Sequence, residues 1–130
     1  PALSLYSKVV HVQHLPKGSS IGYGSTYTTT DTETIATIPV GYADGYPRAL
    51  SNKGSVLIHG TRCPIVGRIC MDQCMVKVPD HITVSPGDAV VLLGKQGQES
   101  ITALELAYLV GTIPYEIFCN FSERVPRHYI

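Results

Sequence analysis

The sequence has no tryptophan, only two phenylalanines and no long apolar run. A transmembrane helix needs about 20 consecutive apolar residues, and no stretch approaches that length, so we expect no membrane contact from this chain. Ten basic residues balance ten acidic ones, and like charges do not gather into runs. Nucleic acid and anionic lipid, which require a basic surface, are therefore not expected as partners.

The glycine-rich and serine-centred motifs of nucleotide-binding proteins and serine hydrolases are also missing. A chain of 130 residues with 44% hydrophobic content can bury a core without disulfides. We therefore expect one domain, and reduced, mostly buried cysteines at Cys63, Cys70, Cys74 and Cys119, as in a cytoplasmic protein. His59 adds a zinc-ligand type near three of them, but the C-x3-C spacing has no second pair, so no metal site is predicted.

Short β-prone segments separated by turn residues run through most of the chain. Strands are predicted over 5–15, 26–30, 34–40, 55–59, 63–68, 73–78 and 89–93, and an extended segment over 124–127. Thr102 and Glu105 suit a capping box that opens a helix over Ala103–Val110, which Gly111 ends, and Pro114 suits the first turn of another. The expected fold is mainly β: a small β-barrel-like domain with one or two short helices near the C-terminus.

One tyrosine occupies an unusual position, between two glycines. Gly22 and Gly24 can adopt positive φ angles, so Tyr23 is expected to project from a sharp bend. By itself this pattern is typical of a half-buried loop tyrosine, whose ring packs against apolar neighbours while its hydroxyl stays exposed to solvent. The alternative is a phenol that binds a ligand or takes part in catalysis.

Several ordered motifs together resemble the C-terminal β-domain of the alanine racemase family. They lie at residues 22–27, 37–48, 66–73, 113–116 and 122–127, so the resemblance covers essentially the whole chain. It implies that residues 1–130 form one domain of a pyridoxal 5'-phosphate enzyme whose N-terminal (β/α)8 barrel is absent here. The chain, which starts at Pro1, is expected to be cut from a longer protein.

The resemblance also implies an assembly. Barrel and β-domain would form a head-to-tail homodimer, in which each site is shared with the N-terminal barrel of the partner subunit. The lysine that binds the cofactor covalently would lie in the barrel, and none of the lysines here sits in a matching motif. This chain alone is therefore expected to be inactive.

The family motifs carry roles onto individual residues of this sequence. Tyr23 would be the second catalytic base, Tyr115 would reach the cofactor phosphate, and the substrate would be contacted by Met71, Asp72 and Tyr42. The entrance gate would consist of Arg48, Arg68 and Ile113. Ordinary surface roles stay open for the two arginines, as does a turn role for Met71 and Asp72.

These residue types suit the chemistry that the resemblance implies. Racemisation removes a proton from one face of the α-carbon and returns one to the other, so it needs two bases. A tyrosine with a pKa near 10 needs a neighbouring cation or donor to act as one. The implied function is interconversion of L-alanine and D-alanine for cell-wall peptidoglycan precursors. A serine-preferring racemase and a non-enzymatic β-barrel binding module are the alternatives.

Overall fold

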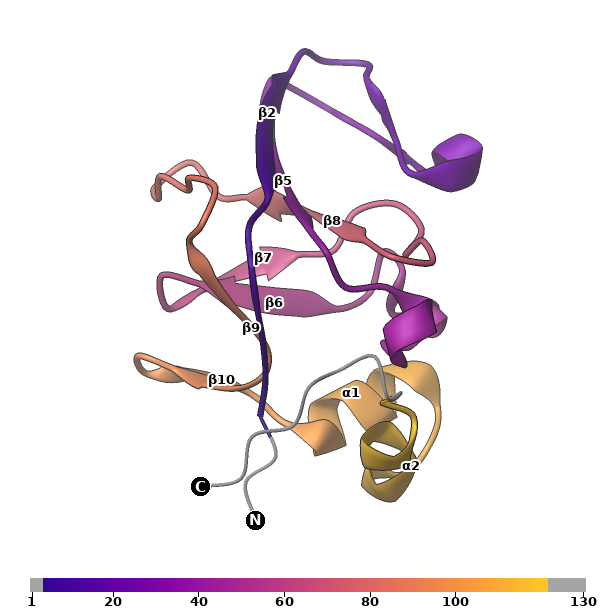
Figure 1. Cartoon of the computed structure of the whole chain (residues 1–130). Coiled ribbons are helices and arrows are strands. Elements are labelled where there is room, and N and C mark those ends of the chain that lie inside the picture. Colours follow the sequence, from indigo (N-terminus) through magenta and orange to yellow (C-terminus); the bar gives the residue numbers. More distant parts are fainter. Residues whose placement is uncertain (1–3, 122–130) are drawn as a thin grey trace.

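The computed structural model describes residues 4–121, which fold mainly into strands with two short helices near the end (Figure 1). The strands are β1 (Leu5–Lys8), β2 (His11–Leu15), β3 (Ser20–Ile21), β4 (Tyr27–Thr28), β5 (Glu33–Ile38), β6 (Ser55–Ile58), β7 (Thr61–Pro64), β8 (Cys74–Val78), β9 (Ala89–Gln96) and β10 (Glu99–Ile101). The helices are α1 (Ala103–Val110) and α2 (Pro114–Cys119), and short 3-10 turns are η1 (Tyr23–Ser25), η2 (Tyr42–Asp44) and η3 (Arg48–Leu50). The predicted mainly β class is confirmed.

The described strands form antiparallel sheets of three sizes. The largest has the order β1-β9-β6-β7 with β10 paired to β9, the second has the order β2-β5-β8, and the smallest pairs β3 with β4. Within residues 4–121 these pairings leave the sheets open, so the expected barrel-like shape holds only loosely. No helix in this part of the chain is long and apolar enough to cross a membrane.

The single strand predicted over 5–15 is wrong, because the chain changes sheets in its middle. The Val9 N–H donates to the Asp88 carbonyl at 3.0 Å, and the Val10 N–H donates to the Thr37 carbonyl at 3.0 Å. Strand β1 therefore pairs with β9, whereas β2 pairs with β5. This crossing connects the two larger sheets (Figure 1).

Other strand ends shift for local reasons. Strand β5 ends at Ile38, two residues before the predicted end at 40, because Pro39 has no N–H to donate. Strand β7 ends at Pro64, earlier than predicted, and beyond it Ile65 makes only an isolated bridge with Val76. Strand β9 runs further than predicted and turns back into β10, a hairpin that the sequence analysis missed.

Helix α1 has the bounds predicted from its caps. The Glu105 N–H donates to the Thr102 hydroxyl at 3.1 Å, and Gly111 ends the helix with a φ of 76°. The Glu105 carboxylate does not stay at the helix start as a capping box expects, because it accepts two bonds from the Arg62 guanidinium, at 2.7 and 2.8 Å. Helix α2 begins with Pro114, also as predicted.

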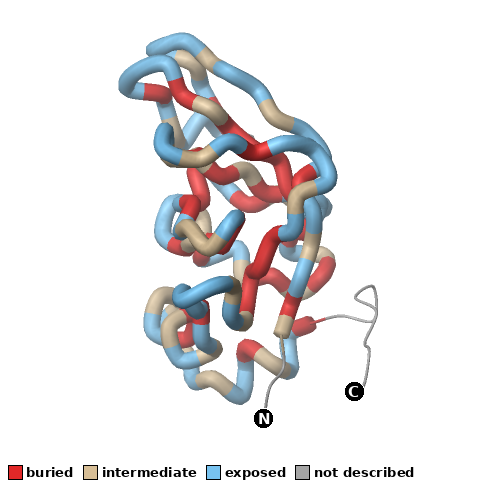
Figure 2. Tube along the Cα trace, turned by 90° about the vertical axis from the view of Figure 1, so that its left-hand side faces the viewer, coloured by how far each residue is buried: buried red, intermediate tan, exposed pale blue. Residues whose placement is uncertain are grey.

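The main apolar core joins the two larger sheets to the helices. It contains side chains from β5, β6, β8 and β9 together with Leu106 of α1 and Ile117 of α2. Figure 2 shows the buried residues concentrated in the body of the domain, with the end formed by 16–32 mostly exposed. A separate small cluster of Ile21, Ile35 and Val66 lies where the Tyr23 segment leaves the body. The extended segment expected over 124–127 lies outside the described residues.

Candidate functional site

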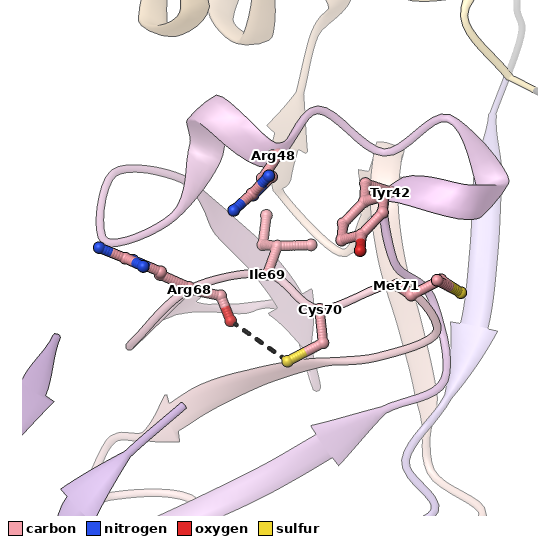
Figure 3. Close-up of a pocket in the computed structure, with 6 residues that line it drawn as sticks. All are labelled: Tyr42, Arg48, Arg68, Ile69, Cys70 and Met71. Atoms are coloured by element: carbon pink, nitrogen blue, oxygen red, sulfur yellow. Dashed lines mark hydrogen bonds between the residues drawn. The ribbon is translucent and has the colours of Figure 1, made fainter. Parts of the chain in front are cut away.

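A pocket of about 320 Å³ lies between the loop after β5 and the loop before β8. Its lining residues are Tyr42, Arg48, Arg68, Ile69, Cys70 and Met71. Figure 3 shows Tyr42 and Arg48 extending from one loop toward the segment 68–71, while the Met71 side chain points away from the two arginines. Four of the residues predicted for the site therefore line one pocket.

The two loops are held together by their backbones. The Tyr42 N–H donates to the Cys70 carbonyl and the Ala43 N–H to the Met71 carbonyl, both at 3.0 Å. A Cβ atom on Gly41 would overlap these same two carbonyl oxygens. Glycine at this position is what allows Tyr42 to lie beside Met71.

Positive charge dominates the lining of the pocket. The Arg48 guanidinium lies 5.5 Å from the centre of the Tyr42 ring, close enough for a cation–π contact. Arg68 supplies a second guanidinium, and none of the six lining residues is acidic. Guanidinium groups bind carboxylates and phosphates well, so this pocket suits a small anionic ligand. Asp72, predicted to contact substrate, is exposed directly after Met71.

The segment that carries Tyr23 lies against the backbone and side chain of Arg68. Gly22 and Gly24 have φ angles of 81° and 76°, as the sequence predicts. A Cβ on Gly22 would lie 3.0 Å from the Arg68 backbone nitrogen, and one on Gly24 would lie 3.1 Å from Arg68 Nη1. The structure describes the backbone of Tyr23 in η1 but not its side chain. The backbone at Tyr23 is thus brought next to a pocket residue.

A buried carboxylate anchors the far end of this segment. Glu33 is 3% exposed and accepts bonds from the Tyr27 hydroxyl at 2.7 Å and from the Thr30 N–H at 2.9 Å. Burial opposes ionisation of Glu33, but these bonds and the nearby Lys77 hold its pKa below the usual value. Burial and the same carboxylate raise the pKa of Tyr27 to about 12. Tyr27 therefore stays protonated and acts as a tether.

Besides Tyr23 and Asp72, two more predicted site residues are not among those that line the pocket. Ile113 and Tyr115 lie at the start of α2 and are 59% and 71% exposed. Helix α2 is nevertheless a neighbour of the Tyr42 loop, since a Cβ on Gly45 would overlap the Asn120 carbonyl. A hydrogen bond with the Cys119 thiol raises the pKa of Tyr115, so its hydroxyl is a proton donor at neutral pH.

The cysteines differ in their surroundings. All four are free, and burial raises the pKa of both Cys63 and Cys74 to about 12. Cys70 lines the pocket, although it was not among the predicted site residues. Across residues 4–121 no three histidine, cysteine, aspartate or glutamate side chains are grouped closely enough to hold a metal ion.

Comparison with known proteins places this arrangement in a family. A family model described as the alanine racemase C-terminal domain matches residues 2–129. The chain belongs to that family. The alanine racemase of Symbiobacterium thermophilum is 60% identical over 129 residues, covering 99% of this chain and 34% of its own length. The chain therefore spans about a third of such an alanine racemase.

Solved alanine racemases have the same fold. That of Bacillus anthracis, with bound L-Ala-P, superposes with a TM-score of 0.95 at 49% identity, over 100% of this chain and 33% of that one. That of Bartonella henselae, with covalently bound pyridoxal phosphate, gives a TM-score of 0.91 at 36% identity, over 98% of this chain and 34% of that one. At these identities the resemblance stated from the sequence motifs is confirmed.

Proposed function

We propose that this chain works as the C-terminal domain of a complete alanine racemase, which interconverts L-alanine and D-alanine for peptidoglycan precursors. The observation that carries the proposal is the pocket shared by Tyr42, Met71 and two arginines in a chain of this family. An amino-acid substrate brings a carboxylate, which suits the positive lining. The Met71 N–H would bind that carboxylate, with Asp72 and Tyr42 beside it.

Tyr23 is the proposed base for one face of the substrate. It would remove or return the proton at the α-carbon, while a lysine of the N-terminal barrel serves the other face. The described surroundings favour this role, because the Arg68 guanidinium lies against Gly24, next to Tyr23. A nearby positive charge lowers the pKa of a phenol and so favours its basic form.

The residues present also fit pyridoxal 5'-phosphate as the cofactor. Tyr115 offers an exposed, protonated hydroxyl that can donate to a phosphate oxygen. The cofactor supplies the electron sink that stabilises negative charge at the α-carbon. Its covalent lysine is assigned to the barrel, since the pocket described here is lined by no lysine.

Arg48, Arg68 and Ile113 are proposed to gate the entrance to this site. The barrel of the partner subunit would cover the site and complete a homodimer. Exposed apolar side chains support such a cover: Met71, Leu104, Tyr108, Ile113 and Tyr115 are all more than half exposed. We place the protein in the cytoplasm, where the four free cysteines stay reduced.

The direct test is an enantiomer assay on the full-length protein. It should convert L-alanine to D-alanine when loaded with pyridoxal phosphate, whereas residues 1–130 alone should neither racemise alanine nor bind the cofactor covalently. Turnover of serine in preference to alanine would assign the serine-preferring racemase instead. Loss of all racemase activity in a folded, cofactor-loaded protein would reject the proposed function.

A further inference from the structure

Two consecutive polar residues connect the loops of the proposed site. Ser51 and Asn52 follow η3 in a tight turn. In this turn the N–H groups of Lys53 and Gly54 both donate to the Leu50 carbonyl at 2.9 Å. Leu50 is fully buried in the main core. The turn is therefore fixed to the body of the domain, and its side chains extend from a rigid base.

Asn52 reaches two different loops with the two ends of its amide. Its Oδ1 accepts a bond from the Gly67 N–H at 2.7 Å, and its Nδ2 donates to the Thr26 hydroxyl at 3.2 Å. Gly67 precedes the pocket residue Arg68, and Thr26 follows the η1 turn that contains Tyr23. The Asn52 backbone has a φ of 59°, a left-handed conformation that asparagine tolerates better than most residues.

Ser51 makes a similar connection inside the pocket wall. Its hydroxyl donates to the Arg48 carbonyl at 2.6 Å and accepts a bond from the Ile69 N–H at 2.8 Å. Arg48 and Ile69 lie on the two loops that face each other across the pocket. One serine hydroxyl thus ties the two loops together.

The two loops that Asn52 joins are also in close backbone contact at two glycines. A Cβ on Gly67 would lie 2.8 Å from the Ile21 carbonyl oxygen, and one on Gly22 would lie 3.2 Å from the Gly67 Cα. At this point backbone meets backbone. Beside this point Ile21 and Val66 pack with Ile35 in a small apolar cluster. The Asn52 bonds add directional contacts that oppose a lateral shift between the two loops.

We propose that Ser51 and Asn52 are positioning residues that set the placement of Tyr23 relative to Arg68 and Met71. This inference rests on the proposed function, in which Tyr23 and Met71 act on one substrate. Asn52 fixes the Tyr23 segment against Arg68, and Ser51 fixes the loop of Arg48 against the segment that leads to Met71. Neither residue needs to touch the substrate.

The test uses Asn52→Gly in the full-length protein. Glycine can adopt the left-handed backbone conformation without strain, and it removes both hydrogen bonds of the Asn52 side chain. Hydrogen–deuterium exchange at the Gly67 amide should quicken by roughly 2- to 10-fold, as loss of one hydrogen bond predicts. Exchange of the substrate α-proton with solvent should fall roughly 10- to 100-fold for the enantiomer served by Tyr23, since small misplacements of a catalytic group are costly. It should fall much less for the other enantiomer.

Two further variants separate positioning from general stability. His59 has a φ of 53° and its side chain bonds Asp88, away from the pocket, so His59→Gly is a matched control that should leave both α-proton exchange rates unchanged. Asn52→Asp keeps an acceptor for the Gly67 N–H and can accept a hydrogen bond from the Thr26 hydroxyl. It should restore the wild-type ratio of the two exchange rates.

The outcomes are distinct. Faster exchange of the Gly67 amide, together with slower α-proton exchange for the enantiomer served by Tyr23, supports the positioning role. Unchanged amide exchange, or an equal fall in α-proton exchange for both enantiomers, overturns it. If the wild-type protein does not racemise alanine, the proposed function fails, and with it the role of these residues in positioning a base. Amide exchange would then still show whether Asn52 holds the two loops together.

Discussion

In strand β6 the side chains of Val56, Leu57 and Ile58 are fully buried, and the strand is paired on both sides, with β7 and β9. The loop face, formed by 21–30, 41–52 and 66–73, is built differently. Some of its side chains, such as Tyr46, Leu50 and Ile69, are buried in the core. The loops also contact one another through close backbone approaches at glycines and single side-chain hydrogen bonds. The core is stabilised by buried apolar area. The placement of the loops relative to one another also depends on glycines that leave room for the neighbouring backbone and on a few specific hydrogen bonds. A change can therefore damage the site while sparing the fold.

The core should show the largest loss of stability. Leu57→Ala removes a fully buried side chain and should lower the free energy of unfolding by about 2–5 kcal/mol, measured by urea denaturation of this chain. Leu104→Ala is the matched control, because Leu104 is 68% exposed and its truncation should cost less than about 0.5 kcal/mol. Equal costs at the two positions would contradict the burial pattern.

On the loop face, adding a side-chain atom at a glycine in close backbone contact should destabilise the domain. Gly41→Ala places a Cβ on the carbonyls of Cys70 and Met71 and should destabilise the domain by about 1–3 kcal/mol. Amide NMR shifts should change mainly at 42–44 and 70–71. Gly54→Ala is the control, because its Cβ meets only side-chain atoms of Ile65 and Leu50, at 3.1 Å or more. Amide NMR shift changes of the same size for both variants would contradict the close approach of Gly41 to the carbonyls of Cys70 and Met71.

The smallest expected effect is at the anchor of the Tyr23 segment. Glu33→Gln leaves the Thr30 N–H without its carboxylate acceptor and should cost about 1 kcal/mol near pH 7. Because folding lowers the Glu33 pKa, its stabilisation is complete above the ordinary carboxyl value of about 4.3 and is lost as the pH falls through the folded value. The stability difference between wild type and variant should shrink in acid. A difference that stays constant from pH 7 to acid would contradict an ionised anchor.

Local signals explain which parts of the fold could be predicted. The bounds of α1 follow from Thr102 and Gly111, and the end of β5 follows from Pro39, because each acts through its own backbone. The change of sheet at Val9 and Val10 could not be predicted, because two valines suit either sheet and only their distant partners decide. The Thr102 and Gly111 caps thus predicted the bounds of α1, whereas the segment over 5–15, which has no such local signal at its middle, was predicted as one strand.

The same distinction applies to the site. Tyr42, Arg48, Arg68 and Met71 were found because whole motifs matched a family, and the structure brings them to one pocket. Ser51 and Asn52 were missed, because their bonds join segments that lie 15 or more residues apart, apart from the local bond to Arg48. Such partners leave no pattern in a single sequence. Sharing a pocket does not test a role, so the roles of all eight predicted site residues stay predictions.

The central claim is that Tyr23 serves as the base for one face of the substrate, and Tyr23→Phe in the full-length protein tests it. Loss of the hydroxyl should leave cofactor binding and dimerisation intact and reduce racemisation roughly 10²- to 10⁴-fold, or about 3–5 kcal/mol of barrier. Tyr6→Phe, at an exposed tyrosine of β1, is the control and should change nothing.

The decisive measurement is exchange of the α-proton with solvent deuterium, followed separately for L-alanine and D-alanine in the Tyr23→Phe variant. Racemisation must fall equally in both directions, because the equilibrium fixes their ratio, but the two exchange rates are independent. The family resemblance assigns Tyr23 to the L-enantiomer, so exchange should fall much further for L-alanine than for D-alanine. Equal losses for both enantiomers, with cofactor and dimer intact, would contradict the account.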